Sequence, residues 1–324
     1  MTAGKVIDWA GVFPAALTMF DHDGQLDEVA TAAHIDYLIR SGAHGVIVAG
    51  TSGQFIALDE EERRRVVDVA VSTARGRVPV LAGTGCYATR DTIRLTEYAA
   101  TAGADGAIVI LPYYQRPTEA EVYEHFRVVG RESPIPVMIY NNPANSAAPA
   151  LGVSKIRELY EGGYAQALKS TLPTVHEIHE VRAETDAGFR VFYGSFMAPL
   201  EGLVGGAHGW VSGILNVVTA EAVDLWTAVR AGDLAGAHAA WRRILPTKLL
   251  YTRQLLGPAS DLAVYRGILR LRGEVAGYSR APMLDLTDAQ MERLRALLES
   301  GALLEGHTSP READPGDVGM RHGS

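Results

Sequence analysis

Short apolar runs alternate along the first two thirds of the chain with longer polar segments of helical periodicity. Runs rich in Val and Ile that are bounded by Gly and polar residues are typical of parallel strands covered on both faces. Eight such runs occur: "GVFPAAL" from Gly11, "HGVIVAG" from His44, "VPVLAG" from Val78, "GAIVIL" from Gly106, "IPVMIYN" from Ile135, "YAQALK" from Tyr164, "FRVFYG" from Phe189 and "HGWVSG" from His208. The pattern predicts an α/β protein with a (β/α)8 TIM barrel.

The remainder of the chain, beyond the eighth run, has helical periodicity. Four segments carry apolar residues at spacings of three and four: "AEAVDLWTAVRAG", "DLAGAHAAWRRILPTKLLYTRQLL", "DLAVYRGILRLRG" and "TDAQMERLRALLESG". The first would complete the barrel. We therefore predict a barrel domain over 1–231, a C-terminal helical extension over 232–304, and a polar tail rich in Gly and Pro over 305–324 that is disordered.

Composition and charge narrow the classes of partner. With 47% hydrophobic and 21% charged residues, the chain is typical of a globular protein with a sizeable core. The net charge of -8 argues against a nucleic-acid or anionic-membrane surface, which needs clustered basic residues. We expect a cytoplasmic protein whose partners are small molecules or copies of itself, because no signal peptide and no long apolar run is visible.

Cysteine and histidine usage predicts no metal site. Cys86 is the only cysteine, so no intramolecular disulfide can form, and no Cys/His cluster has the spacing of metal ligands. The residues that close the apolar runs also include no acidic pair that could hold a divalent metal.

In barrels of this kind, catalytic residues lie where the strands end. The second run closes on Gly50, Thr51, Ser52, Gly53 and Gln54, the fifth on Tyr140, and the sixth on Lys169. Lys169 is one of only four lysines in the chain and follows Ala165, Ala167 and Leu168. An apolar setting lowers the pKa of a lysine and makes its neutral amine available.

A neutral amine attacks carbonyl groups, and with a 2-oxo acid it forms an imine that allows the next carbon–carbon bond to be made or broken. Tyr140 is the candidate for proton transfer, and Thr51, Ser52 and the backbone amides of their loop are candidates for binding the carboxylate. Each residue alone has an ordinary explanation: a lysine can reach solvent, a Gly-rich loop can simply connect, and a tyrosine can pack. Their joint occurrence at runs two, five and six favours catalysis.

Six motifs occur in the order and at the spacing of a known family: "GTSGQFIALDEEER", "AGTG", "LPYYQRPTEAEVYEHF", "YNNPA", "ALKST" and "GGAHGWVSGILN". Over nearly its whole length the chain resembles the dihydrodipicolinate synthase and N-acetylneuraminate lyase family of lysine-dependent class I aldolases. The resemblance implies that Lys169 forms the imine, that Tyr140 relays protons, and that Thr51 with Ser52 binds the carboxylate. It also implies that no metal or organic cofactor is needed.

The resemblance further implies a homotetramer built as a dimer of dimers. Tyr114 matches the tyrosine that members of the family insert into the active site of a neighbouring subunit. The alternative is a monomeric barrel in which Tyr114 lies in its own pocket.

Departures from the family pattern bear on the second substrate. Asn145 stands where the synthase branch has an arginine for a second carboxylate, and an amide cannot give that bidentate charged pair. After Gly194, Phe196 and Met197 stand where the sialic acid lyases have an acidic pair for sugar hydroxyls. Gln54 and Ser170 replace acidic residues, so we expect an outer pocket that is apolar to weakly polar and uncharged. The predicted substrate-binding set is Gly50, Gly53, Gln54, Asn145, Gly194, Phe196, Met197 and Val211.

These features predict a class I aldolase that acts on pyruvate or a pyruvate-derived 2-oxo acid with a small or hydrophobic aldehyde. A polyol or dicarboxylate partner is disfavoured. Two alternatives stay open: a dehydratase or deaminase that uses the same imine to expel water or ammonia, and a barrel that has lost catalysis and serves as a ligand-binding scaffold.

Overall fold

A computed structural model describes residues 7–299 of the chain. Its strands are β1 Gly11–Pro14, β2 Val46–Val48, β3 Val80–Gly83, β4 Gly106–Ile110, β5 Val137–Asn141, β6 Ala167–Ser170, β7 Arg190–Tyr193 and β8 Gly209–Ser212. Its α-helices are α1 Glu28–Arg40, α2 Glu60–Ala74, α3 Thr89–Ala102, α4 Glu119–Glu132, α5 Val153–Glu161, α6 His176–Glu184, α7 Pro199–Val204, α8 Leu215–Arg230, α9 Leu234–Thr252, α10 Asp261–Leu271 and α11 Asp288–Glu299. Two 3-10 helices, η1 Phe55–Ala57 and η2 Pro143–Asn145, follow β2 and β5.

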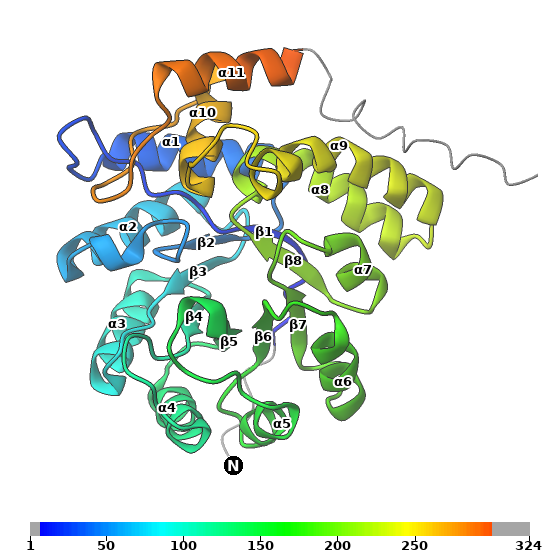
Figure 1. Ribbon diagram of the computed structural model, residues 1–324. Helices are drawn as coiled ribbons and strands as arrows, with labels where there is room; N and C mark the ends of the chain where they lie inside the picture. The colour runs from blue at the N-terminus through cyan, green and yellow to red at the C-terminus, as the bar shows by residue number, and fades with distance from the viewer. Residues whose placement is uncertain (1–6, 300–324) are drawn as a thin grey trace, which may run out of the picture.

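The eight strands form one parallel sheet that closes on itself, and the helices surround it (Figure 1). Each strand pairs with its neighbour in the chain, and β1 pairs with β8. A parallel bridge between Ala15 and Ile47 links β1 to β2 and completes the ring. The predicted (β/α)8 barrel is confirmed, with one strand for each of the eight apolar runs.

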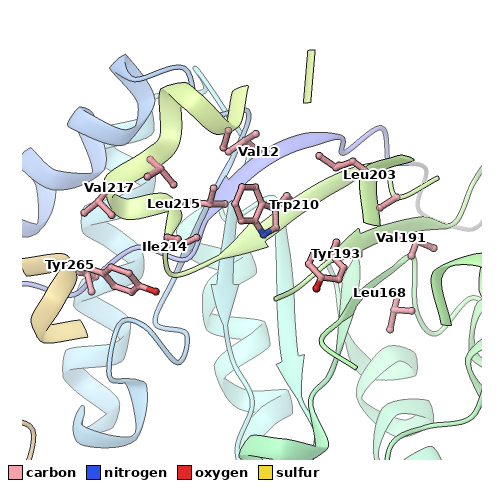
Figure 2. Close-up of a cluster of buried hydrophobic side chains, with 14 of the residues drawn as sticks. Val12, Leu168, Val191, Tyr193, Leu203, Trp210, Ile214, Leu215, Val217 and Tyr265 are labelled. Atoms are coloured by element: carbon pink, nitrogen blue, oxygen red, sulfur yellow. The ribbon is translucent and has the colours of Figure 1, made fainter. Parts of the chain in front are cut away.

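The period of two along each strand separates an inner from an outer core. On β6, Ala167 faces the barrel interior with Phe13 and Phe192, whereas Leu168 joins the larger cluster between the sheet and the helices. Figure 2 shows part of that outer cluster, in which Trp210, Tyr193 and Leu168 lie between β6, β7, β8 and their covering helices. Since Lys169 is two residues from Ala167, it also faces the interior, at the end where the strands stop.

The helices after β8 gather on one side of the barrel. α9 packs along α8, and α10 contacts α8, α9 and α11, as Figure 1 shows at the top of the view. α8 ends at Arg230 and α9 begins at Leu234, on either side of the division predicted at residue 231. The last residues of the predicted helical extension and the predicted disordered tail at 305–324 lie outside the described residues. Within residues 7–299, no helix combines the length and the apolarity that crossing a lipid bilayer requires.

Candidate active site at the strand ends

A pocket of about 290 Å³ opens where the carboxyl ends of the strands meet. The predicted site residues among its lining are Gly50, Thr51, Ser52, Tyr140, Asn145, Lys169, Gly194 and Phe196. They come from the ends of β2, β5, β6 and β7 and from the loops that follow. The barrel therefore brings together residues that are up to 146 positions apart in the chain, from Gly50 to Phe196.

Lys169 and Tyr140 are register partners on the adjacent strands β6 and β5. The Lys169 Nζ lies 3.7 Å from the centre of the Tyr140 ring, and the two residues are only 5% and 8% exposed. A cation over an aromatic face is an attractive arrangement in a site shielded from water. The amine and the phenol are thus held side by side at the base of the pocket.

The hydroxyl of Tyr140 is also in a polar environment. Burial by itself raises the pKa of Tyr140, but the Lys169 ammonium and hydrogen bonds from Lys169, Thr51 and Asn142 outweigh it, so the pKa lies below its usual value. The Asn142 side-chain amide donates to this hydroxyl at 2.8 Å. A phenol with a lowered pKa gives up its proton more readily, which suits it to proton transfer.

The loop after β2 provides amides rather than charged groups. Ser52 is buried and Thr51 is exposed to the pocket. Within residues 7–299, the backbone N–H groups of Thr51 and Ser52 have no hydrogen-bond acceptor. Gly53 allows the turn to pack closely, because a Cβ there would come within 2.9 Å of the Thr18 Oγ1. Free amides beside two hydroxyls form a concave site for an anion such as a carboxylate.

The loop after β7 closes tightly over the lysine. A side chain at Gly194 would place its Cβ 2.8 Å from the Lys169 Cγ and 2.7 Å from the Ser170 carbonyl oxygen. Beyond Gly194, the Trp210 Nε1 donates to the Ser195 carbonyl at 2.8 Å and orders the loop. Phe196 lines the pocket, whereas Met197 is 49% exposed and lies outside its lining.

Other predicted residues also lie outside the pocket. Val211 belongs to the buried cluster of the barrel interior, and Gly53, in the loop after β2, packs against Thr18. The Gln54 side chain is turned away, since its amide donates to the Arg280 carbonyl at 2.9 Å and its oxygen accepts from the Arg280 backbone N–H at 3.2 Å. Tyr114 is 92% exposed and lies on the surface of its own chain with φ at 83°.

Of the pocket residues that the sequence analysis did not predict, three bear most on the chemistry of the site. Asn142 lies inside the motif that contains Tyr140, so its position beside the tyrosine was a usable signal. Asp261 and Tyr265 reach the pocket from α10 of the C-terminal helices, and no motif marks them. The expectation of an uncharged outer pocket is wrong at this wall, because Asp261 contributes a carboxyl group there.

A buried carboxyl group lies behind the lysine strand. The Glu177 Oε1 accepts from the Asn141 Nδ2 at 2.5 Å, and its Oε2 has no hydrogen-bond partner among the described residues. Burial raises the pKa of Glu177 to about 6, although hydrogen bonds from Ser170 and Asn141 partly offset the effect. Glu177 therefore supports the outer faces of the β5 and β6 ends and does not line the pocket. Across residues 7–299, no three metal-ligating side chains come together.

Comparisons with known proteins agree with this geometry. Residues 8–301 match the model of the dihydrodipicolinate synthetase family. A 4-hydroxy-tetrahydrodipicolinate synthase of Methanothrix thermoacetophila is 34% identical over 298 residues, which cover 91% of this chain and 98% of that protein. The synthase of Bacillus subtilis is 32% identical, over 87% of this chain and 96% of its own length. A prophage protein of the family from E. coli, solved in complex with pyruvate, superposes with a TM-score of 0.83 at 30% identity over 91% of this chain and 99% of its own.

Proposed function

Since the chain belongs to the dihydrodipicolinate synthetase family, whose members are carbon–carbon lyases, we propose that it is a class I aldolase that binds pyruvate or a pyruvate-derived 2-oxo acid as an imine on Lys169. The observation that carries the proposal is the Lys169 Nζ held 3.7 Å from the Tyr140 ring centre at the base of a pocket. The pyruvate found with the E. coli relative supports the choice of oxo acid.

In the proposed reaction, the Lys169 amine attacks the ketone carbon of pyruvate and forms a carbinolamine. Loss of water then gives the protonated imine, and removal of a proton from the methyl carbon gives the enamine. The enamine carbon attacks the aldehyde carbonyl, whose oxygen takes up a proton, and hydrolysis of the imine releases the product and restores the amine. Tyr140 moves these protons, while the Thr51 and Ser52 amides hold the carboxylate.

The curated relatives are named as synthases, but the pocket of this chain favours a different second substrate. Asn145 replaces the expected arginine, and no arginine of the described part of the chain lines the pocket. Asp261 would repel a second carboxylate at the same time. The volume of about 290 Å³ is at the small end for ligand sites and favours a small aldehyde.

Borohydride trapping with pyruvate tests the imine. We expect an irreversible adduct on the intact protein, mapped to the peptide that contains Lys169, and no adduct in Lys169→Ala. Lys248→Ala is the matched control, since Lys248 is a half-buried lysine outside the pocket lining that donates to the Met197 carbonyl, and it should trap normally. No adduct with any oxo acid from folded protein would contradict the proposal and favour a ligand-binding scaffold.

Product analysis separates the two kinds of lyase that the same imine could serve. Cleavage of an aldol to free pyruvate and an aldehyde supports the aldolase. An unsplit carbon skeleton, with water or ammonia released, would instead identify a dehydratase or deaminase.

We also propose that the enzyme assembles as a homotetramer in which Tyr114 serves the site of a neighbouring copy. Its ring is 92% exposed and lines a surface hollow with Tyr87 instead of its own pocket. Light scattering should give a tetramer mass, and Tyr114→Ala should lower activity while trapping of pyruvate continues. A monomer of full activity would contradict the role.

A further inference from the structure

The helix α10 forms one wall of the pocket. Asp261 and Tyr265 are four residues apart, so they lie on the same face of α10, and both line the pocket. The wall adjoins the carboxylate loop, because a Cβ on Gly213 would lie 2.5 Å from the Ser52 Oγ and 3.2 Å from the Tyr265 ring.

Asp261 is not needed to cap its helix. The N-cap is Ser260, whose hydroxyl oxygen accepts from the Ala263 backbone N–H at 3.1 Å. One Asp261 oxygen accepts from the Leu262 backbone N–H at 3.0 Å, which fixes the direction of the carboxyl group.

Tyr265 is held rigidly by aromatic neighbours. Its ring meets Tyr251 edge to face at 5.7 Å between centroids, and Tyr251 meets Phe196 at 5.2 Å. Figure 2 shows the Tyr265 ring reaching from α10 toward the loop after β8, with the hydroxyl at its far end. The wall is therefore ordered before any substrate binds.

The pocket combines a carboxyl group with an amine. Among the residues that the structure describes, Asp261 is the only acidic residue in its lining and Lys169 the only basic one. The surrounding protein raises the pKa of the Asp261 carboxyl group by desolvation, against hydrogen bonds from the Leu262 backbone and Tyr265. Such a group accepts a hydrogen bond from a neutral ligand and disfavours an anion.

We propose that Asp261, positioned beside Tyr265, selects a short aldehyde that carries a hydroxyl group next to its carbonyl. The inference rests on the proposed aldolase function and names the class of its second substrate. The volume of about 290 Å³ disfavours a long polyol, and the Asp261 carboxyl group disfavours a dicarboxylate. The Asp261 carboxyl group can accept a hydrogen bond from a single hydroxyl group of the aldehyde.

The test compares glycolaldehyde with acetaldehyde, which has the same number of carbons and lacks the hydroxyl. At saturating pyruvate, kcat/KM for each aldehyde is measured in the wild type, Asp261→Ala and Asp288→Ala. Asp288 is the matched control because it is the first residue of α11, as Asp261 is of α10, and it lies outside the pocket.

A lost hydrogen bond to a charged group changes selectivity by roughly tenfold to a hundredfold. We expect Asp261→Ala to lower the preference for glycolaldehyde by about tenfold or more, mainly through KM. Asp288→Ala should leave the preference unchanged. A purely structural role for Asp261 would lower activity with both aldehydes equally, and that result would overturn the inference.

Two further measurements separate the ways in which the inference could fail. Pyruvate trapping in Asp261→Ala should equal that of the wild type. If the wild type itself does not trap pyruvate, the proposed aldolase function is wrong. If trapping is normal but Asp261→Ala keeps the wild-type preference between the aldehydes, only the role of Asp261 is wrong. Aminoacetaldehyde, which carries an ammonium group in place of the hydroxyl of glycolaldehyde, tests whether Asp261 selects a charged donor. If the wild type prefers it to glycolaldehyde and Asp261→Asn loses that preference, the assignment of a hydroxyl is wrong.

Discussion

The two walls of the pocket differ in how they are built. The strand-end wall carries Lys169 and Tyr140, which the register of β5 and β6 places side by side. The wall from α10 carries Asp261 and Tyr265, which reach the pocket only because a helix near the end of the chain docks over the barrel. In the proposed reaction, the first wall binds and activates the oxo acid, and the second selects the aldehyde. The proposed chemistry and the proposed selectivity are thus assigned to separate elements.

Two arginines tie the C-terminal part of the chain to the barrel. The buried Arg266 donates from Nη2 to the Thr18 carbonyl at 2.8 Å and from Nη1 to the Ala276 carbonyl at 2.5 Å. Arg280 forms an ion pair with Glu62 at 2.6 Å, and its backbone pairs with the Gln54 side chain. Both contacts tie the C-terminal helices to the loops after β1 and β2. The Gln54 side chain, predicted to bind substrate, instead connects the loop after β2 to the segment after α10.

The largest effect should come from the strand-end wall. Tyr140→Phe removes the phenol hydroxyl that accepts from Asn142, and loss of a proton-transfer group costs about a hundredfold to ten-thousandfold in rate. We expect kcat to fall in that range with either aldehyde, measured by steady-state kinetics. Tyr193→Phe, which removes a buried hydroxyl outside the pocket, is the control and should keep kcat within about threefold. Equal losses in the two variants would contradict the assignment.

Loosening the α10 wall should affect the second substrate more than the first. Arg266→Leu leaves the Thr18 and Ala276 carbonyls without their donor, at a cost of about 1–3 kcal/mol each in the free energy of unfolding. We expect a lower unfolding midpoint in urea and a raised KM for the aldehyde. Pyruvate trapping should persist, because Lys169 and Tyr140 lie on the strands. If Arg266→Leu instead lost pyruvate trapping and kept the KM for the aldehyde, the α10 wall would serve the first substrate and not the second.

Glu177 gives the strand-end wall a pH-dependent stability. Its pKa in the folded protein is about 6 against an ordinary 4.5, so the folded state binds the proton more tightly. That stabilisation is fully present below pH 4.5 and is lost as the pH rises through 6, a difference of 1.5 pKa units or about 2 kcal/mol. Glu177→Gln should therefore gain stability relative to the wild type from pH 4.5 to pH 7.5 in urea titrations.

The control for Glu177 is Glu97→Gln on the exposed face of another covering helix, α3. Its stability relative to the wild type should not change over this pH range. A stability difference for Glu177→Gln that stays constant or decreases with pH would show that the buried carboxyl group is not the cause.

The smallest expected effect concerns the setting of the Tyr140 pKa. Asn142 donates a hydrogen bond that favours the phenolate, so Asn142→Leu should raise the pKa of Tyr140 and move the corresponding limb of the kcat profile to higher pH. Asn145→Leu changes another amide in the pocket that does not contact this hydroxyl, and it should leave the limb in place. A limb at the same pH in all three proteins would exclude Asn142 from this role.

Most of the fold and half of the site were accessible from the sequence. Eight Val- and Ile-rich runs predict eight parallel strands, and the residues that close runs two, five and six predict the groups at the strand-end wall. The placement of Gln54, Met197, Val211 and Tyr114 was not accessible. For these residues a family position indicated a site, but the direction of each side chain depends on neighbours that are distant in the chain.

By itself the sequence determined the barrel and the pairing of Lys169 with Tyr140, because the direction of a side chain on a strand follows a local period of two and parallel register aligns the strand ends. Only the tertiary structure decided that Asp261 and Tyr265 line the pocket. Helical periodicity predicts which face of α10 is buried but not what it is buried against. The part of the barrel against which α10 packs is set by contacts such as the hydrogen bond from Arg266 to the Thr18 carbonyl, which join residues 248 positions apart.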